Sequence, residues 1–192
     1  TTMYGAEHED IAYSYRTGNH GDGSWYSING NIDYQRTSRK NKQRMITFSY
    51  KINTQPQTSN SNTGYEDIHA KEEVGDLVKR LLLKNNQSDG KTNTMEQTFQ
   101  VDYTTPIGEL HTVEAGAKYI FRRNTSDNKL YEAAGGSDDY LYNEDRSSDY
   151  RHLNHILAAY LGYTLKYKDF TFKPGVRYEQ TVQRVKYIVG PG

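Results

Sequence analysis

The stretch that decides the fold is residues 155–181, which read His-Ile-Leu-Ala-Ala-Tyr-Leu-Gly-Tyr-Thr-Leu-Lys-Tyr-Lys-Asp-Phe-Thr-Phe-Lys-Pro-Gly-Val-Arg-Tyr-Glu-Gln-Thr. Apolar side chains recur at every second position on both sides of a turn at residues 167–169. They are Leu157, Ala159, Leu161, Tyr163 and Leu165 before the turn, and Phe170, Phe172, Val176 and Tyr178 after it. A period of two predicts two antiparallel strands that share one apolar face.

Such a face fits two environments, the core of a soluble sandwich or the lipid around a transmembrane β-barrel. Hydrophobic residues make up only 34% of the 192 residues, against roughly 45–50% apolar usage in soluble domains. A large soluble core is therefore disfavoured, whereas a barrel wall needs an apolar residue only at every second position. The 18 tyrosines suit a membrane interface, where one end of the ring is apolar and the other is wet.

Composition also bounds the partners and the chemistry. The formal net charge is zero, so nucleic acid is not an expected partner. The absence of cysteine excludes disulfides and thiolate chemistry. The sequence contains no run of about 18 apolar residues, so no transmembrane helix is expected.

The same alternation recurs at five other places and predicts seven strands in all. The further strands are expected at residues 9–16, 26–35, 45–53, 97–105 and 113–122, with a loop at the glycines of 18–23 between the first two. Short turns are expected at 38–42, 106–109 and 167–169, and long polar loops at 54–92 and 124–149. Short turns at one end and long loops at the other are typical of outer-membrane barrels.

One segment of the first long loop allows two interpretations. Val74, Leu77, Val78, Leu81 and Leu82 follow helical spacing, with acidic residues before them and Lys84 after them. An amphipathic helix and an extended continuation of the next strand are both compatible with this pattern.

Four strand motifs resemble a known family. Thr98-Phe99-Gln100-Val101-Asp102-Tyr103-Thr104-Thr105-Pro106, Glu114-Ala115-Gly116-Ala117-Lys118-Tyr119, Ile156-Leu157-Ala158-Ala159-Tyr160 and Gly175-Val176-Arg177-Tyr178-Glu179 are similar to the barrel of Bacteroidetes outer-membrane proteins related to TonB-dependent receptors. The resemblance covers roughly residues 24–192. These motifs indicate architecture and do not identify a ligand.

The resemblance implies a barrel of about 22 strands that is closed by an amino-terminal plug domain and works with the TonB energy-coupling system. The plug and the coupling segment are absent from the 192 residues, and seven strands do not close a bacterial barrel. Residues 1–192 are therefore expected to be part of one outer-membrane β-barrel domain, an all-β antiparallel segment that forms a curved, open sheet when seen alone.

The alternation divides the candidate site residues between two faces. The polar residues expected to face the lumen are Asp33, Asp102, Glu114, Lys118, Lys173, Arg177 and Glu179. They either line a permeation path or contact a plug, or they simply pair with one another and with water. The residues expected to face lipid are Ile46, Phe48, Val101, Leu157, Leu161 and Val176.

The sequence gives little support for a metal-binding or catalytic site. The acidic residues of the second loop, Asp138, Asp139, Glu144, Asp145 and Asp149, match no EF-hand spacing and are expected to be solvated. His152 and His155 fall on opposite faces of a strand, so they are not a metal pair. No catalytic motif or phosphate loop is present, and neither an enzyme nor a bound cofactor is expected.

Three functions remain open at this point. The first is a segment of an energised uptake receptor for an unidentified extracellular solute, located in the outer membrane. The second is a barrel with another role, such as a passive pore, an adhesin or a secretion channel. The third is a soluble β-rich binding module.

Overall fold

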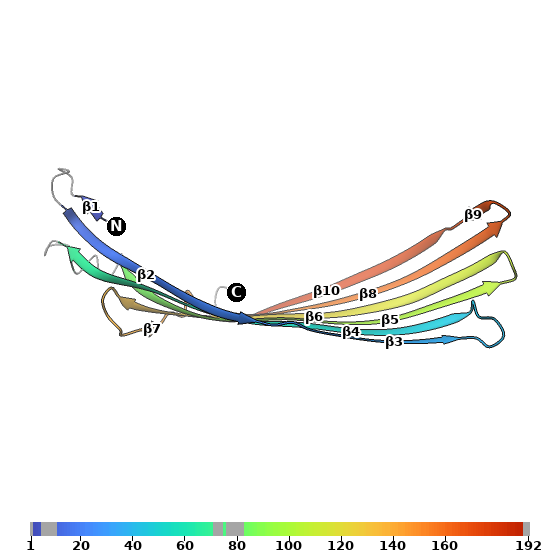
Figure 1. The fold of residues 1–192 in the computed structure, drawn as a ribbon, viewed down its shortest axis with the longest axis horizontal. Coiled ribbons are helices and arrows are strands. Elements are labelled where there is room, and N and C mark those ends of the chain that lie inside the picture. Colours follow the sequence, from blue (N-terminus) through green and yellow to red (C-terminus); the bar gives the residue numbers. More distant parts are fainter. Residues whose placement is uncertain (1, 5–10, 71–74, 76–82, 190–192) are drawn as a thin grey trace.

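The computed structural model describes residues 2–4, 11–70, 75 and 83–189, which form one antiparallel 10-stranded sheet (Figure 1). Its strands are β1 (Thr2–Tyr4), β2 (Ile11–Trp25), β3 (Ile28–Thr37), β4 (Met45–Ala70), β5 (Lys84–Ile107), β6 (His111–Ala134), β7 (Leu141–Tyr142), β8 (Ser148–Tyr167), β9 (Phe170–Phe172) and β10 (Gly175–Val189). Their order is β1-β2-β4-β5-β6-β8-β10, with β3 beside β4, β7 beside β6 and β9 beside β8. The predicted all-β, antiparallel, open sheet is confirmed.

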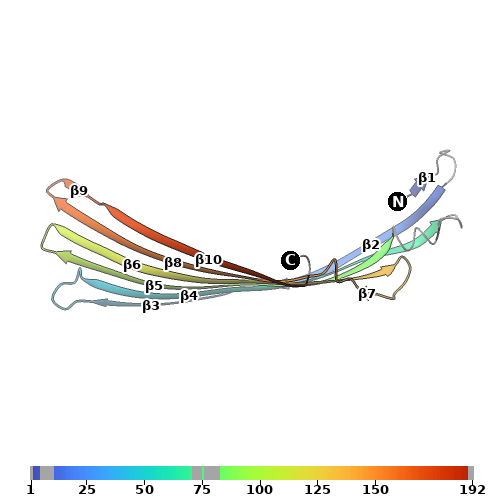
Figure 2. The same ribbon diagram turned by 180° about the vertical axis from the view of Figure 1, so that it is seen from behind.

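The sheet is curved along its strands and has two different ends (Figures 1 and 2). The short connections, residues 38–44, 108–110 and 168–169, lie together at one end, which we call the turn end. The end of β4, the start of β5 and the connection 135–147 lie at the other end, which we call the far end. Gly108 has a positive φ of 68°, which explains why glycine occupies the middle of a tight turn.

The predicted long loops are wrong in their bounds. Most of 54–92 is strand, because β4 continues to Ala70 and β5 begins at Lys84. Residues 124–134 and 148–149 also lie in strands, within β6 and β8. Most side chains on both faces are polar in these segments, so the alternation disappears. The backbone nevertheless stays paired with its neighbours, as in the pair Thr63 and Asn86.

The predicted loop at residues 18–23 is also wrong. Gly18, Gly21 and Gly23 lie inside β2 and pair with β4. Moreover, β2 and β3 follow one another along the same side of β4, in one register that runs from Arg16 opposite Glu66 to Thr37 opposite Met45. The strands expected at 9–16 and 26–35 therefore lie one after the other along the same edge of β4. Backbone hydrogen bonds to β4 hold these glycines in an extended conformation, although residues 18–23 show no alternation of apolar and polar side chains.

Two further points concern helices. The side chains of the expected helical pattern at 74–82 lie outside the described residues, so neither interpretation of that segment is tested. No helix in the described ranges is long and apolar enough to cross a membrane.

Pro174 lies between β9 and β10, where a proline removes one backbone donor. Its carbonyl still accepts a hydrogen bond from the Tyr163 backbone N–H, at 3.0 Å. The pairing with β8 resumes at Gly175, so the proline interrupts the strand without shifting its register.

Candidate functional site

Six of the seven polar candidates can be placed by strand register, because paired residues of neighbouring strands project to the same side. Two adjacent rows of one face cross the sheet and contain five of them. One row is Asp33, Ser49, Gln100, Lys118, Ala158 and Glu179, and the other is Gln35, Thr47, Asp102, Gly116, Tyr160 and Arg177. Glu114 pairs with Gly162 on the same face, and Lys173 lies between β9 and β10. We call this the polar face.

The six apolar candidates lie on the opposite face, which we call the apolar face. Phe48 and Val101 belong to a row that continues through Ala117 and Ala159. Ile46, Leu161 and Val176 belong to the row beside it, and Leu157 to the next row on the other side. The division into two faces thus matches the sequence, and the lumen and lipid contacts of these residues stay predictions.

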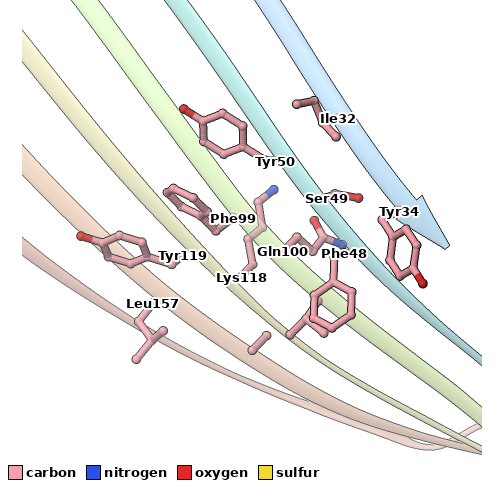
Figure 3. Close-up of a pocket in the computed structure, with 12 residues that line it drawn as sticks. Ile32, Tyr34, Phe48, Ser49, Tyr50, Phe99, Gln100, Lys118, Tyr119 and Leu157 are labelled. Atoms are coloured by element: carbon pink, nitrogen blue, oxygen red, sulfur yellow. The ribbon is translucent and has the colours of Figure 1, made fainter. Parts of the chain in front are cut away.

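An aromatic band crosses the apolar face (Figure 3). The rings of Tyr50 and Phe99 have centroids 4.8 Å apart, and those of Phe99 and Tyr119 lie 6.4 Å apart. These rings border a shallow hollow of about 470 Å³ that also includes Phe48 and Leu157. Phe48 and Leu157 are 48% and 50% exposed. A surface with so many exposed apolar side chains requires an apolar surrounding or a partner.

On the polar face, Tyr160 links three strands. Its ring lies over Gly116, its direct partner on β6, and its hydroxyl donates a 2.7 Å hydrogen bond to Asp102 on β5. Gln100 donates to the other carboxylate oxygen of Asp102, also at 2.7 Å. Because Gly116 has no side chain, the tyrosine can reach across β6, and the three strands are tied together on this face.

Ion pairs join only some of the polar candidates. Arg177 lies 2.6 Å from Glu179 on the same strand. Asp33 accepts a 3.1 Å hydrogen bond from the side chain of Asn31. Sequence analysis did not identify the pair of Arg122 and Glu96, which are direct partners on β6 and β5, 2.5 Å apart.

At the far end the connection 135–147 folds back on β6 around Glu132, whose side chain is only 11% exposed. Lys84 lies 3.3 Å from one carboxylate oxygen, and Asn143 donates to the same oxygen at 2.8 Å. Arg146 binds the other oxygen. The hydroxyl of the buried Ser147 donates to the carbonyl of Asn143 at 2.6 Å. The carboxylate of Glu132 is therefore the centre of an ordered loop.

Burial acts to raise the pKa of Glu132, but the hydrogen bonds from Asn143, Lys84 and Arg146 outweigh it and hold this pKa below its usual value of 4.5. A folded-state pKa below the unfolded one contributes stability that is fully present above pH about 4.5 and is lost as the pH falls through the folded pKa. The order of the loop should follow the same dependence.

Glu132→Gln is expected to lower the hydrogen-exchange protection of residues 143–147 about tenfold at pH 7, because the variant loses hydrogen bonds to charged groups. In the parent protein the protection factors of the same amides should fall once the pH drops below about 4.5. Asp139→Asn is the control, since Asp139 lies in the same connection and forms no ion pair within the described residues. Equal effects of the two changes would refute the role of Glu132.

The same connection also reaches β4 and β5. Asn85 donates a 3.1 Å hydrogen bond to the carbonyl of Ser137, and the hydroxyl of Tyr140 lies 3.5 Å from the side-chain oxygen of Asn62. A hollow of about 450 Å³ opens beside these contacts, and Tyr65 and Asp138 also line it. Its lining is mixed polar and aromatic, so it offers both hydrogen-bonding groups and a ring to a polar solute.

No three His, Asp or Glu side chains converge as a metal site anywhere in the described ranges. His152 and His155 pair with residues on opposite faces, Asn124 and Phe121. The nitrogen of His155 bonds the hydroxyl of Tyr119 at 2.7 Å.

The sequence contains only weak indications of the contacts that sequence analysis did not identify. Arg122 and Glu96 become direct partners only once the register of β5 and β6 is known. Glu132 belongs to a segment expected to be loop, and its three partners come from β5 and from the connection 135–147. No spacing rule links positions so far apart in the chain.

Comparison with known proteins agrees with this architecture. Residues 36–189 match the model of a family described as "Outer membrane protein beta-barrel family". No curated protein matches the sequence. One similar solved structure is the crystal structure of the ferric citrate transporter FecA in the unliganded form, at 14% identity and a TM-score of 0.37. The similarity covers 92% of this chain and 31% of that chain, and at this TM-score it supports neither a fold nor a function.

Proposed function

Because this chain belongs to the outer membrane protein beta-barrel family, we propose that it forms part of the wall and the extracellular rim of a TonB-dependent receptor. This receptor would capture an extracellular solute and import it with energy from the inner membrane. Membership of the family places the chain in the outer membrane, which excludes the soluble binding module. The proposal includes no catalytic step.

The observation that carries the proposal is the length of the strands at the far end. A strand of about 9–11 residues crosses a bilayer, whereas β4 has 26 residues and β5 and β6 have 24 each. The apolar rows of the apolar face are confined to the part nearer the turn end. More than half of each strand is therefore available to build a rigid wall outside the membrane, on the side where outer-membrane barrels carry their long connections.

The folded connection 135–147 supports recognition at this rim. It is held by Glu132 on one side and by contacts with Asn85 and Asn62 on the other. Binding residues are frequent on loops that a rigid scaffold positions. A passive pore needs no such ordered structure beyond the membrane, so the rim favours capture of a solute.

Energised import rests on the resemblance of the strand motifs to Bacteroidetes receptors. In this proposal the polar face of the wall, including Asp102 and Lys118, surrounds an amino-terminal plug domain, and the TonB system moves the plug. The solute stays unidentified. The ion pairs and hydrogen bonds of the polar face give it a fixed surface against which a plug can seat.

Removal of the rim tests the proposal in the intact protein. Thr63 and Asn86 are direct partners, so deletion of residues 63–86, with an Asn-Gly turn joining Asn62 to Gln87, keeps the remaining register of β4 and β5. The barrel should still insert, as heat-modifiable gel mobility would report. Uptake of the solute that the intact gene supports should be lost.

The control separates a receptor from a pore. In the parent protein, uptake should saturate with solute concentration and should stop when an ionophore collapses the inner-membrane potential. Uptake that is linear in concentration and insensitive to the ionophore would assign the chain to a passive pore. If the variant that lacks residues 63–86 takes up the solute normally, these residues are not needed for recognition.

A further inference from the structure

Four cations gather on the apolar face at its border toward the far end. Leu153 on β8 is paired with Arg123 on β6 and with Arg184 on β10. In the next row outward, Arg151 is paired with Lys186. We call Arg123, Arg151, Arg184 and Lys186 the basic belt.

The position of the basic belt follows from register. Arg151 and Leu153 share their face with Leu157 and Leu161, because all four occupy alternate positions of β8. Toward the turn end the rows of this face are mostly aromatic and aliphatic. Neighbouring strands are about 4.8 Å apart, and alternate residues of one strand are about 7 Å apart. The Cα atoms of the four basic residues therefore lie within an area about 10 Å across.

The cations of the basic belt have no counter-charge of their own. None of the four side chains forms an ion pair or a hydrogen bond with the described part of the chain, and Arg151, Arg184 and Lys186 are exposed. Some other arginines of the sheet behave differently, since Arg122 and Arg177 are paired with glutamates.

The nearest acidic residues on this face lie beyond the belt. Asp127 and Asp149 are partners one row farther out, and Asp127 lies 3.9 Å from Lys129. The charge on the face therefore changes from positive at the border of the apolar rows to mixed farther out. A positive patch at this border attracts anions at the same height.

We propose that the basic belt binds the phosphate groups of anionic lipid headgroups in the outer leaflet. In an outer-membrane barrel the apolar face lies against lipid, and the long connections are extracellular, so the residues next beyond the apolar rows on the far side meet the headgroups of the outer leaflet. Guanidinium groups bind phosphate through paired hydrogen bonds. This binding depends on location in the outer membrane and not on the solute or on energised import.

The test uses the intact protein in bilayer nanodiscs of phosphatidylcholine, with or without a minor fraction of phosphatidic acid. Native mass spectrometry counts the phosphatidic acid that stays bound. Each basic residue near a charged membrane surface contributes about 1 kcal/mol, so Arg123→Gln with Arg184→Gln should weaken phosphatidic acid binding about 30-fold. Arg123→Lys with Arg184→Lys should retain most of it.

The matched control removes the same two charges from the polar face, by Lys51→Gln with Lys118→Gln, and should leave lipid binding unchanged. Binding by the parent protein should also weaken as salt is raised. The proposal is overturned if the control loses as much lipid as the belt variant, or if the belt variant binds like the parent. It is also overturned if cross-linking shows that a second copy of the chain covers the belt.

Discussion

Leu161→Arg is expected to lower the free energy of unfolding of the intact barrel by about 2–4 kcal/mol if this residue lies near the middle of the bilayer. Leu161 is 52% exposed and lies in one row of the apolar face with Ile46 and Val176. An arginine at this position would place its charge in lipid, away from water and from any carboxylate.

The chain contains its own comparison. Arg177 directly follows Val176 and is tolerated because it projects to the polar face, where Glu179 pairs with it. For a matched control we choose Thr181→Arg, since Thr181 is exposed on the polar face of β10. Thr164 shares that face but is only 4% exposed, so an arginine there would be crowded as well as charged.

Urea titration followed by heat-modifiable gel mobility would measure both variants in the intact protein. We expect the transition of Thr181→Arg to stay close to that of the parent. If Leu161→Arg and Thr181→Arg destabilise the barrel equally, the assignment of the two faces is wrong.

Gly116→Val should have the second largest effect, a loss of about 1–3 kcal/mol from overpacking. A β-carbon on Gly116 would overlap the ring of Tyr160, its nearest neighbour, and would lie 2.6 Å from a carboxylate oxygen of Asp102. The tyrosine would have to leave its place over β6, and its hydrogen bond to Asp102 would break.

Two controls separate these contributions in the same urea titration. Gly162→Ala should be tolerated, because its nearest neighbour would be Glu114 at 3.6 Å, an ordinary contact. Tyr160→Phe keeps the ring and removes only the hydrogen bond to a carboxylate, so its cost should be smaller than that of Gly116→Val. A stability of Gly116→Val equal to that of the parent would show that Tyr160 does not depend on the space above Gly116.

The sequence by itself determined the class of fold and the two faces in the part of the sheet near the turn end. Alternation such as that of Leu157, Ala159 and Leu161 depends only on the two-residue period of a strand, so it can be read without knowing any partner. The short turns were found for the same reason, since glycine, proline and polar residues interrupt the period there.

The tertiary structure alone decided where the strands end. Beyond the apolar rows both faces of β4 and β5 are mostly polar, so residues 54–70 and 84–92 show no period of two and were expected to be loop. Their extended form comes from backbone hydrogen bonds with neighbouring strands, and side-chain polarity does not report those bonds. For the same reason Gly18, Gly21 and Gly23 lie in a strand.

The contacts of the candidate site also depended on the tertiary structure. The link of Tyr160 to Asp102 joins positions 58 residues apart, and the basic belt combines β6, β8 and β10. The position of a residue within its own strand determines on which face its side chain lies. Only the register between strands decides which side chains become neighbours on that face, because a shift in register changes every cross-strand pair.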